Sequence, residues 1–329
     1  MNYELPQMHG LVIRNTGYSY TVKSDAGDVF ECKVKGNFRI RGIRTTNPVA
    51  IGDKVEFTPQ DVDTDIEQAR QGLITALDDR KNYIIRKSTN LSKQSHIIAA
   101  NVDMCFLIVT LKQPETPLQF IDRFLASTEA YGVPVTLVFN KVDLLKNNDD
   151  PNSYQEDDLD SVIFLYENIG YPCRKISAKT GEGVEELREE LKGKTVCLSG
   201  NSGVGKSTLI NTLFPGLDLK TNEISDAYET GKHTTTFSEM YETEDGYIID
   251  TPGIKGFGTF DMKKEEIGHY FKEIFHFSAE CRFNNCTHTH EPHCAVRDAV
   301  ERHDISQSRY NSYLSMLEDE KEDKYRQGY

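Results

Sequence analysis

The sequence predicts a multi-domain α/β protein with three parts: a small N-terminal β-barrel, a circularly permuted P-loop domain, and a C-terminal helical domain that binds a metal ion. Three observations predict it. Short alternating segments fill residues 5–75, and buried strands alternate with helices from residue 99 onward. A phosphate-binding motif at Gly200–Ser207 follows a base-recognition motif at Asn140–Asp143, although the usual order is the reverse. Three cysteines and a histidine lie close together after residue 280.

The composition is that of a soluble globular protein, with 37% hydrophobic and 27% charged residues. The longest apolar run, Met104–Leu111, is far shorter than the roughly 20 residues of a membrane helix. Met1–Pro6 has neither the basic stretch nor the apolar core of a signal peptide. We therefore expect a cytoplasmic protein without a membrane segment.

Residues 1–80 are expected to form the barrel. The alternating residue pattern of a short strand recurs in Gly10–Arg14, Tyr18–Val22 and Val29–Val34. A further segment, Gly52–Phe57, follows a turn. Five short strands in about 70 residues predict a small β-barrel. An OB-fold is the first choice and an SH3-like barrel the second.

The charge distribution favours the barrel as the part that contacts an anionic polymer. The net charge of the chain is −14, whereas residues 1–90 hold 13 Lys and Arg against 12 Asp and Glu. Five bases without an intervening acid are the candidate RNA contacts: Lys33, Lys35, Arg39, Arg41 and Arg44. The alternative is a solvated face of a strand and a loop.

Residues 81–98 read as a linker, and residues 99–260 as the permuted P-loop domain. Continuous apolar runs predict buried strands at 102–109, 135–139, 195–198 and 247–249. Helical spacing covers Phe120–Tyr131, and a second helix follows Ser207. Buried strands that alternate with helices indicate a parallel sheet.

The segment Gly200–Ser207 fits G-x-x-x-x-G-K-[ST] between a strand and a helix, as a P-loop requires. Lys206 would reach the β- and γ-phosphates, and the Ser207 hydroxyl would ligate Mg²⁺. The helix N-terminus favours negative charge. The expected nucleotide contacts here are Ser199, Gly200, Asn201, Ser202, Gly203, Val204, Gly205, Lys206, Ser207 and Thr208.

The segment Asn140-Lys141-Val142-Asp143 predicts guanine recognition. The Asp143 carboxylate can accept hydrogen bonds from N1 and N2 of guanine, a donor pair that adenine lacks. Lys141 would lay its stem along the base, and Ser177-Ala178-Lys179 would supply a backbone N–H for guanine O6. A P-loop kinase or ATPase is the alternative, and it predicts no guanine preference.

Two further segments fit the γ-phosphate end of the site. In Asp250-Thr251-Pro252-Gly253, Asp250 would hold the Mg²⁺ shell and Gly253 would offer its N–H to the γ-phosphate. Gly231–Thr236 lies where the first switch belongs, and we expect Thr235 to coordinate Mg²⁺. Its three adjacent threonines also suit a plain β-prone segment.

The position after Gly253 is Ile254, where Ras-like proteins have a glutamine that orients the attacking water. Isoleucine can neither donate nor accept a hydrogen bond. His233 is the nearest candidate for handling the water, and its pKa range suits proton transfer. The alternatives are that His233 is only a polar switch residue, or that the chain is a nucleotide-gated binding module with incidental hydrolysis.

Residues 261–329 are expected to form a helical domain with a charged tail. The spacing Cys281-x₄-Cys286-x-His288-x₅-Cys294 predicts a closed, structural zinc site. His290 and His293 are spare, and either could replace His288. A disulfide would leave an odd cysteine and would suit a reducing compartment poorly.

Taken together, NKVD, SAK, GNSGVGKS, GKHTTT, DTPG and the cysteine–histidine spacing resemble the RsgA (YjeQ/YloQ) GTPases over nearly the whole chain. The resemblance implies a bacterial enzyme that hydrolyses GTP late in maturation of the small ribosomal subunit and is stimulated by that subunit. It also implies that His233 matches a catalytic switch histidine, and that barrel and zinc domain contact ribosomal RNA. We expect a monomer that binds GTP and GDP.

Overall fold

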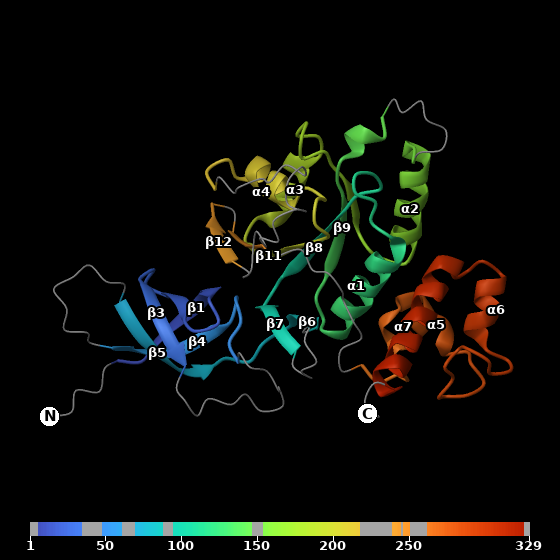
Figure 1. The fold of residues 1–329 in the computed structure, drawn as a ribbon, viewed down its shortest axis with the longest axis horizontal. Helices are drawn as coiled ribbons and strands as arrows, with labels where there is room; N and C mark the ends of the chain where they lie inside the picture. The colour runs from blue at the N-terminus through green and yellow to red at the C-terminus, as the bar shows by residue number, and fades with distance from the viewer. Residues whose placement is uncertain are drawn as a thin grey trace.

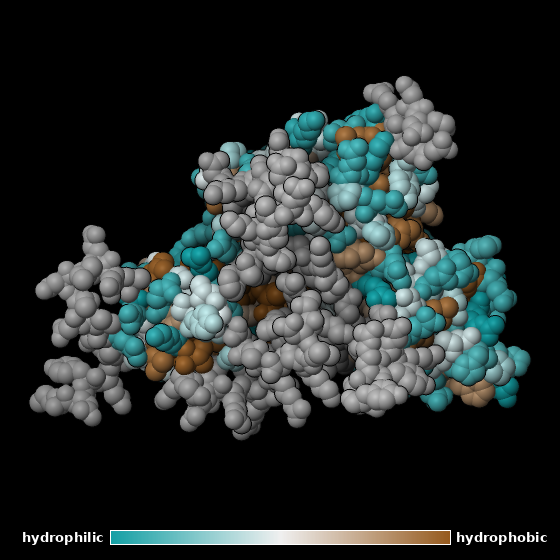
Figure 2. Space-filling model, in the orientation of Figure 1, coloured by the Kyte–Doolittle hydropathy of each residue, from teal (hydrophilic) through white to brown (hydrophobic). Residues whose placement is uncertain are grey.

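The computed structural model describes residues 6–34, 48–60, 70–87, 95–146, 154–217, 239–244, 246–250 and 262–325. Figure 1 shows three parts, with the barrel and the C-terminal helices on opposite sides of an α/β domain. On the face drawn in Figure 2, the described surface is mostly hydrophilic, and its hydrophobic residues form small patches. None of the described helices combines the length and the apolar character that crossing a membrane requires.

The described residues of the barrel form five strands: β1 (Met8–Asn15), β2 (Tyr20–Ser24), β3 (Val29–Val34), β4 (Lys54–Gln60) and β5 (Arg70–Leu77). They pair in the closed order β1-β2-β3-β5-β4-β1, with β3 and β5 parallel. This closed order is that of an OB-fold, so the first choice holds over the SH3-like barrel. Gly72 permits the closure, because a Cβ there would lie 2.7 Å from the Cys32 Sγ and 3.0 Å from the Phe57 ring.

The segment read as a linker contains two antiparallel strands, β6 (Tyr83–Lys87) and β7 (Ser95–Ala100). The segment was predicted as a linker because it is rich in basic and polar residues. Ile84 and Ile97, one on each strand, are nevertheless buried. The pair lies next to the barrel, where the Ala100 N–H donates to the Ile51 carbonyl at 2.8 Å. The domain boundaries at 80, 98 and 260 stay predictions.

The α/β domain is built on a sheet in the order β10-β9-β8-β11-β13-β12. Its parallel strands are β8 (Met104–Val109), β9 (Val135–Phe139), β10 (Cys173–Lys175), β11 (Lys194–Ser199) and β13 (Gly246–Asp250). The last strand of this domain, β12 (Glu239–Thr243), is antiparallel to β13 and pairs with β1 through Arg14 and Glu239. The sheet therefore runs on into the barrel.

Helices cover both faces of this sheet. Alternate residues of β8 separate the two cores: Cys105, Leu107 and Val109 face α1 (Leu118–Ala130) and α2 (Glu156–Asn168), whereas Phe106 and Ile108 face α3 (Val184–Leu191) and α4 (Lys206–Leu213). Burial on both faces explains why these strands are continuous apolar runs, as expected for a parallel sheet.

Between residues 262 and 325, which the structure describes, the C-terminal part contains the short 3₁₀ helix η2 (Ile267–Tyr270) and three α-helices, α5 (Lys272–Ser278), α6 (Ala295–Glu301) and α7 (Gln307–Tyr325). Its apolar core includes Ala126 of α1, so the helices pack directly against the α/β domain. We call residues 262–325 the C-terminal module.

Candidate nucleotide site and metal centre

The predicted nucleotide motifs gather at one edge of the sheet. The segment beginning at Asn140 follows β9, Ser177 comes soon after β10, the P-loop follows β11, and Asp250 ends β13. These are the carboxyl ends of neighbouring parallel strands, where open α/β sheets bind ligands. The permutation has left this spatial arrangement intact.

Asn140 connects the base-recognition loops to the P-loop. Its Nδ2 donates to the Val204 carbonyl at 2.8 Å, and its Oδ1 accepts from the Ala178 N–H at 2.9 Å. The side chain is buried. One amide therefore fixes the relative positions of the loops after β9, β10 and β11.

The P-loop backbone needs its glycines. Gly203 and Gly205 have φ angles of 82° and 96°, which favour glycine. A Cβ at Gly205 would lie 2.5 Å from the Asn140 Nδ2. Lys206 begins α4 and donates to the carbonyls of Gly200 and Asn201 at 2.7 and 2.9 Å, and burial lowers its pKa. The lysine is thus held at the loop centre by neutral acceptors that a phosphate could replace.

Asp143 is positioned by Ser177, whose Oγ donates to the Asp143 Oδ1 at 2.6 Å. The same Oγ accepts from the Thr180 N–H at 3.2 Å. Because the Ala178 N–H is used by Asn140, Lys179 carries the next backbone N–H of this loop, and no described group accepts from it. Lys179 is therefore the better candidate donor to guanine O6.

Lys141 has a left-handed backbone, with φ of 63°, and its Nζ donates to the Gly203 carbonyl at 2.8 Å and to the Gln113 carbonyl. Burial lowers its pKa. The neighbouring residue, Pro114, packs close to Gly203: a Cβ added at Gly203 would lie 3.4 Å from the proline ring. Sequence reasoning missed this loop after β8, because its residues carry no motif and act through backbone and packing.

Asp250 fits a magnesium shell. Its Oδ1 is buried and has no hydrogen-bond partner among the described residues. Burial raises its pKa to about 6, while nearby Lys206 opposes that rise. A divalent cation would satisfy the unpartnered oxygen, and the oxygen donors of Asp250 and Ser207 are of the class that Mg²⁺ prefers.

Several predicted site residues lie outside the described part of the chain. They are His233, Thr235, Gly253 and, in the barrel, Lys35, Arg39, Arg41 and Arg44. Lys33 is described and is exposed at the end of β3. The roles given to these residues stay predictions.

The structure brings Cys281, Cys286, His288 and Cys294 together, with all four ligand atoms within 4.8 Å of one another. The His288 Nδ1 is 3.6 Å from the Cys281 Sγ and 3.5 Å from the Cys294 Sγ, and the two sulfurs are 4.0 Å apart. Zn–S bonds of about 2.3 Å in a tetrahedron require S–S edges of about 3.8 Å. The four residues therefore fit a closed zinc centre.

The spare histidines are not part of this cluster. His290 is exposed and pairs with the Thr289 hydroxyl at 2.8 Å, and His293 is exposed as well. Glu291 instead organises the ligand loop: its carboxylate accepts from the N–H groups of Thr287, Thr289 and His290 at 2.8 to 3.2 Å. The turn places His288 at φ of 56° with its ring toward the cysteines.

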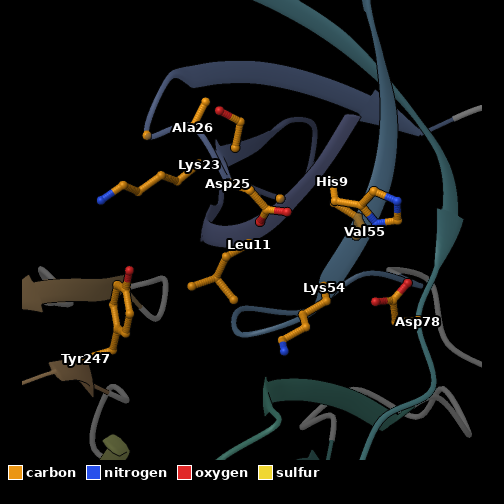
Figure 3. Close-up of a pocket in the computed structure, with 12 residues that line it drawn as sticks. His9, Leu11, Lys23, Asp25, Ala26, Lys54, Val55, Asp78 and Tyr247 are labelled. Atoms are coloured by element: carbon orange, nitrogen blue, oxygen red, sulfur yellow. The ribbon is translucent and has the colours of Figure 1, made fainter. Parts of the chain in front are cut away.

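A separate cleft of about 680 Å³ lies between the barrel and β13 (Figure 3). Leu11 and Lys54 of the barrel face Tyr247 of β13 across it. No predicted nucleotide residue lines this cleft. It marks where the barrel and the α/β domain are incompletely packed.

Comparison with known proteins gives one consistent answer. The RsgA GTPase family matches residues 77–260, and the RsgA N-terminal domain matches residues 9–66. The chain belongs to the RsgA GTPase family. A small ribosomal subunit biogenesis GTPase RsgA of Bacteroides fragilis is 62% identical over 98% of this chain and 100% of that protein. An RsgA 2 of Bacteroides thetaiotaomicron is 60% identical with the same coverage.

Two solved RsgA-family structures share the fold. YjeQ from Thermotoga maritima is 36% identical, with a TM-score of 0.70 over 95% of this chain and 98% of that one. YloQ, described as a circularly permuted GTPase, is 26% identical, with a TM-score of 0.70 over 98% of each chain. The chain therefore shares its overall fold with both structures, one of which is described as a circularly permuted GTPase.

Proposed function

We propose that this RsgA-family chain hydrolyses GTP to GDP and phosphate during late maturation of the small ribosomal subunit, and that the subunit stimulates the reaction. The observation that carries the nucleotide part is the Asn140 amide, which joins the base-recognition loops to the P-loop. The names of its relatives, small ribosomal subunit biogenesis GTPases, support the ribosomal part.

The residues divide the work along the nucleotide. Asp143, held by Ser177, accepts the guanine donors, and the Lys179 N–H meets O6. Lys206 leaves the carbonyls of the P-loop to bind the β- and γ-phosphates. Ser207 and Asp250 hold Mg²⁺, which neutralises phosphate charge when bound. Thr235 and Gly253 are proposed to sense the γ-phosphate.

The metal at the C-terminal cluster is proposed to be one structural Zn²⁺. Three thiolates and one imidazole leave no open ligand position, so the centre stabilises a fold rather than activating water. The module and the barrel, including Lys33, are proposed to contact ribosomal RNA. We also propose that the chain acts as a monomer in the cytoplasm.

The test is the GTP turnover rate of the purified chain with and without small ribosomal subunits. We expect slow turnover alone and a large increase with subunits. Large subunits serve as the control, and equal rates in all three samples would refute the ribosomal role.

The second candidate is a nucleotide-gated binding module in which hydrolysis is incidental, and Ile254 is the observation that favours it. A His233→Ala variant separates the two. Under our proposal it binds GTP normally and loses stimulated turnover. Unchanged stimulated turnover would remove the catalytic role of His233.

A further inference from the structure

We propose that α7 couples metal binding to the docking of the C-terminal module on the α/β domain. In this proposal Tyr310 and Tyr313 are positioning residues for the metal-ligand loop, and Arg309 and Ser312 are docking residues. The inference rests on the proposed zinc centre but goes beyond it, because it assigns the outer residues of that centre and links them to the contact between α7 and α1.

The docking side of α7 is a buried network centred on Asp122 of α1. Arg309 donates through Nη1 to the Asp122 Oδ1 at 2.8 Å, and Ser312 donates to the Oδ2 at 2.6 Å. Tyr166 of α2 donates to the same Oδ1 at 2.8 Å. Arg309 also binds Glu273 of α5 through two nitrogens, at 2.6 and 3.1 Å.

The charged groups of this network are buried, so each needs an ion-pair partner. The Arg309 and Asp122 side chains are 1% and 0% exposed, and that of Glu273 is 6% exposed. Two carboxylates share one guanidinium, so moving α7 away from α1 would strand a buried charge. Removing one partner of a buried ion pair is strongly destabilising. We therefore infer that docking is close to all-or-none.

The metal side of α7 holds the backbone of the ligand loop. The Tyr310 hydroxyl donates to the carbonyl of the ligand His288 at 2.5 Å, and the Tyr313 hydroxyl donates to the Thr287 carbonyl at 2.7 Å. The Tyr313 ring packs edge-on against Phe271, with centroids 5.7 Å apart. Outer groups of this kind orient metal ligands, and their loss typically costs 10- to 100-fold in affinity.

Both sets of contacts come from little more than one turn of α7, at positions 309 and 312 and at positions 310 and 313. A hydrogen-bonded helix moves as a rigid element on this scale. A shift that separates Arg309 from Asp122 also withdraws the tyrosine hydroxyls from the ligand loop. By linkage, metal binding must then strengthen docking by the same factor by which docking strengthens metal binding.

The experiment measures Zn²⁺ affinity of the full chain by competition with a chromophoric chelator. The variants are Tyr313→Phe, Arg309→Met and Ser312→Ala, and the control is Arg302→Met. Arg302 lies in the same module but is 57% exposed and pairs with Asp304 outside the network. We expect Zn²⁺ binding to weaken about tenfold or more in Tyr313→Phe and Arg309→Met, with a smaller loss in Ser312→Ala and none in the control.

The reciprocal measurement is hydrogen exchange of residues 118–130 before and after the chelator removes Zn²⁺. Faster exchange in α1 after removal is the expected result. If Arg309→Met does not fold, Ser312→Ala decides, because it deletes only one hydroxyl. Wild-type Zn²⁺ affinity in Ser312→Ala, or unchanged exchange in α1, would overturn the coupling. Both readouts need no ribosomal subunits, so failure of stimulated GTP turnover leaves them intact.

Discussion

Replacing Asn140 with alanine tests whether one amide organises the nucleotide site. The change deletes two buried hydrogen bonds, to Val204 and from Ala178, at 2.8 and 2.9 Å. Each bond contributes about 0.5–1.5 kcal/mol net, so the pair contributes about 1–3 kcal/mol. Without it, binding must itself order the loops, so we expect the Kd for GDP and GTP to rise about 5- to 150-fold.

The assay is equilibrium titration with a fluorescent guanine nucleotide, and Asn82→Ala is the matched control. Asn82 is a similarly buried amide that bonds Val102 through both its ends, at 2.8 and 2.9 Å, away from the nucleotide loops. Both variants should lose thermal stability, but only Asn140→Ala should lose affinity. A Kd within twofold of wild type in Asn140→Ala, or equal losses in both variants, would refute the reasoning.

Three further predictions concern the same site. Asp143→Asn should weaken GTP binding and improve xanthosine triphosphate binding in competition titrations, and unchanged selectivity would contradict the base contact. Gly205→Ala should abolish nucleotide binding, because its Cβ would meet Asn140 at 2.5 Å, and wild-type affinity would contradict it. Burial raises the pKa of Asp250 from 3.8 to about 6, so its carboxyl destabilises the metal-free fold increasingly as pH rises between these values, by up to about 3 kcal/mol. The measurement is urea unfolding in the presence of a chelator. The free energy of unfolding of Asp250→Asn should exceed that of wild type at pH 7.5, and the difference should disappear near pH 4. Equal unfolding curves at pH 7.5 would contradict the prediction.

The sequence predicted the elements whose cause is local. The strands Met104–Val109 and Val135–Phe139 are buried on both faces, and strands buried in this way can be recognised from their own apolar residues without knowledge of their partners. The P-loop and the guanine motif could also be identified from the sequence, because phosphate and base recognition require fixed residue types at fixed spacing. The structure brings the four predicted ligand atoms together, with His288 rather than His290 or His293, and their role as metal ligands stays a prediction.

The sequence could not predict contacts that depend on tertiary register. Asp122 is a charge on the apolar face of a helix, between Ile121 and Phe124, and this pattern could have marked it as unusual. Nothing local identifies Arg309 as its partner, since the two residues are 187 positions apart. The pairing of β1 with β12 is hidden for the same reason, because Arg14 meets Glu239 only when two separate domains have formed.

The position of β11 in the sheet also creates a risk of aggregation while the chain is being synthesised. β11 inserts between β8 and β13, so Met104–Val109 keeps one open edge until the ribosome has made Lys194–Ser199. An exposed, apolar strand edge is a template for aggregation, and domains begin to fold as they emerge from the N-terminus. Because the motifs are permuted, the ribosome makes the base-recognition half before the half that carries the P-loop. The apolar strand β8 therefore lacks one of its neighbours until β11 has been synthesised. A nascent chain that stalls before residue 194 would leave this edge of β8 without its β11 neighbour.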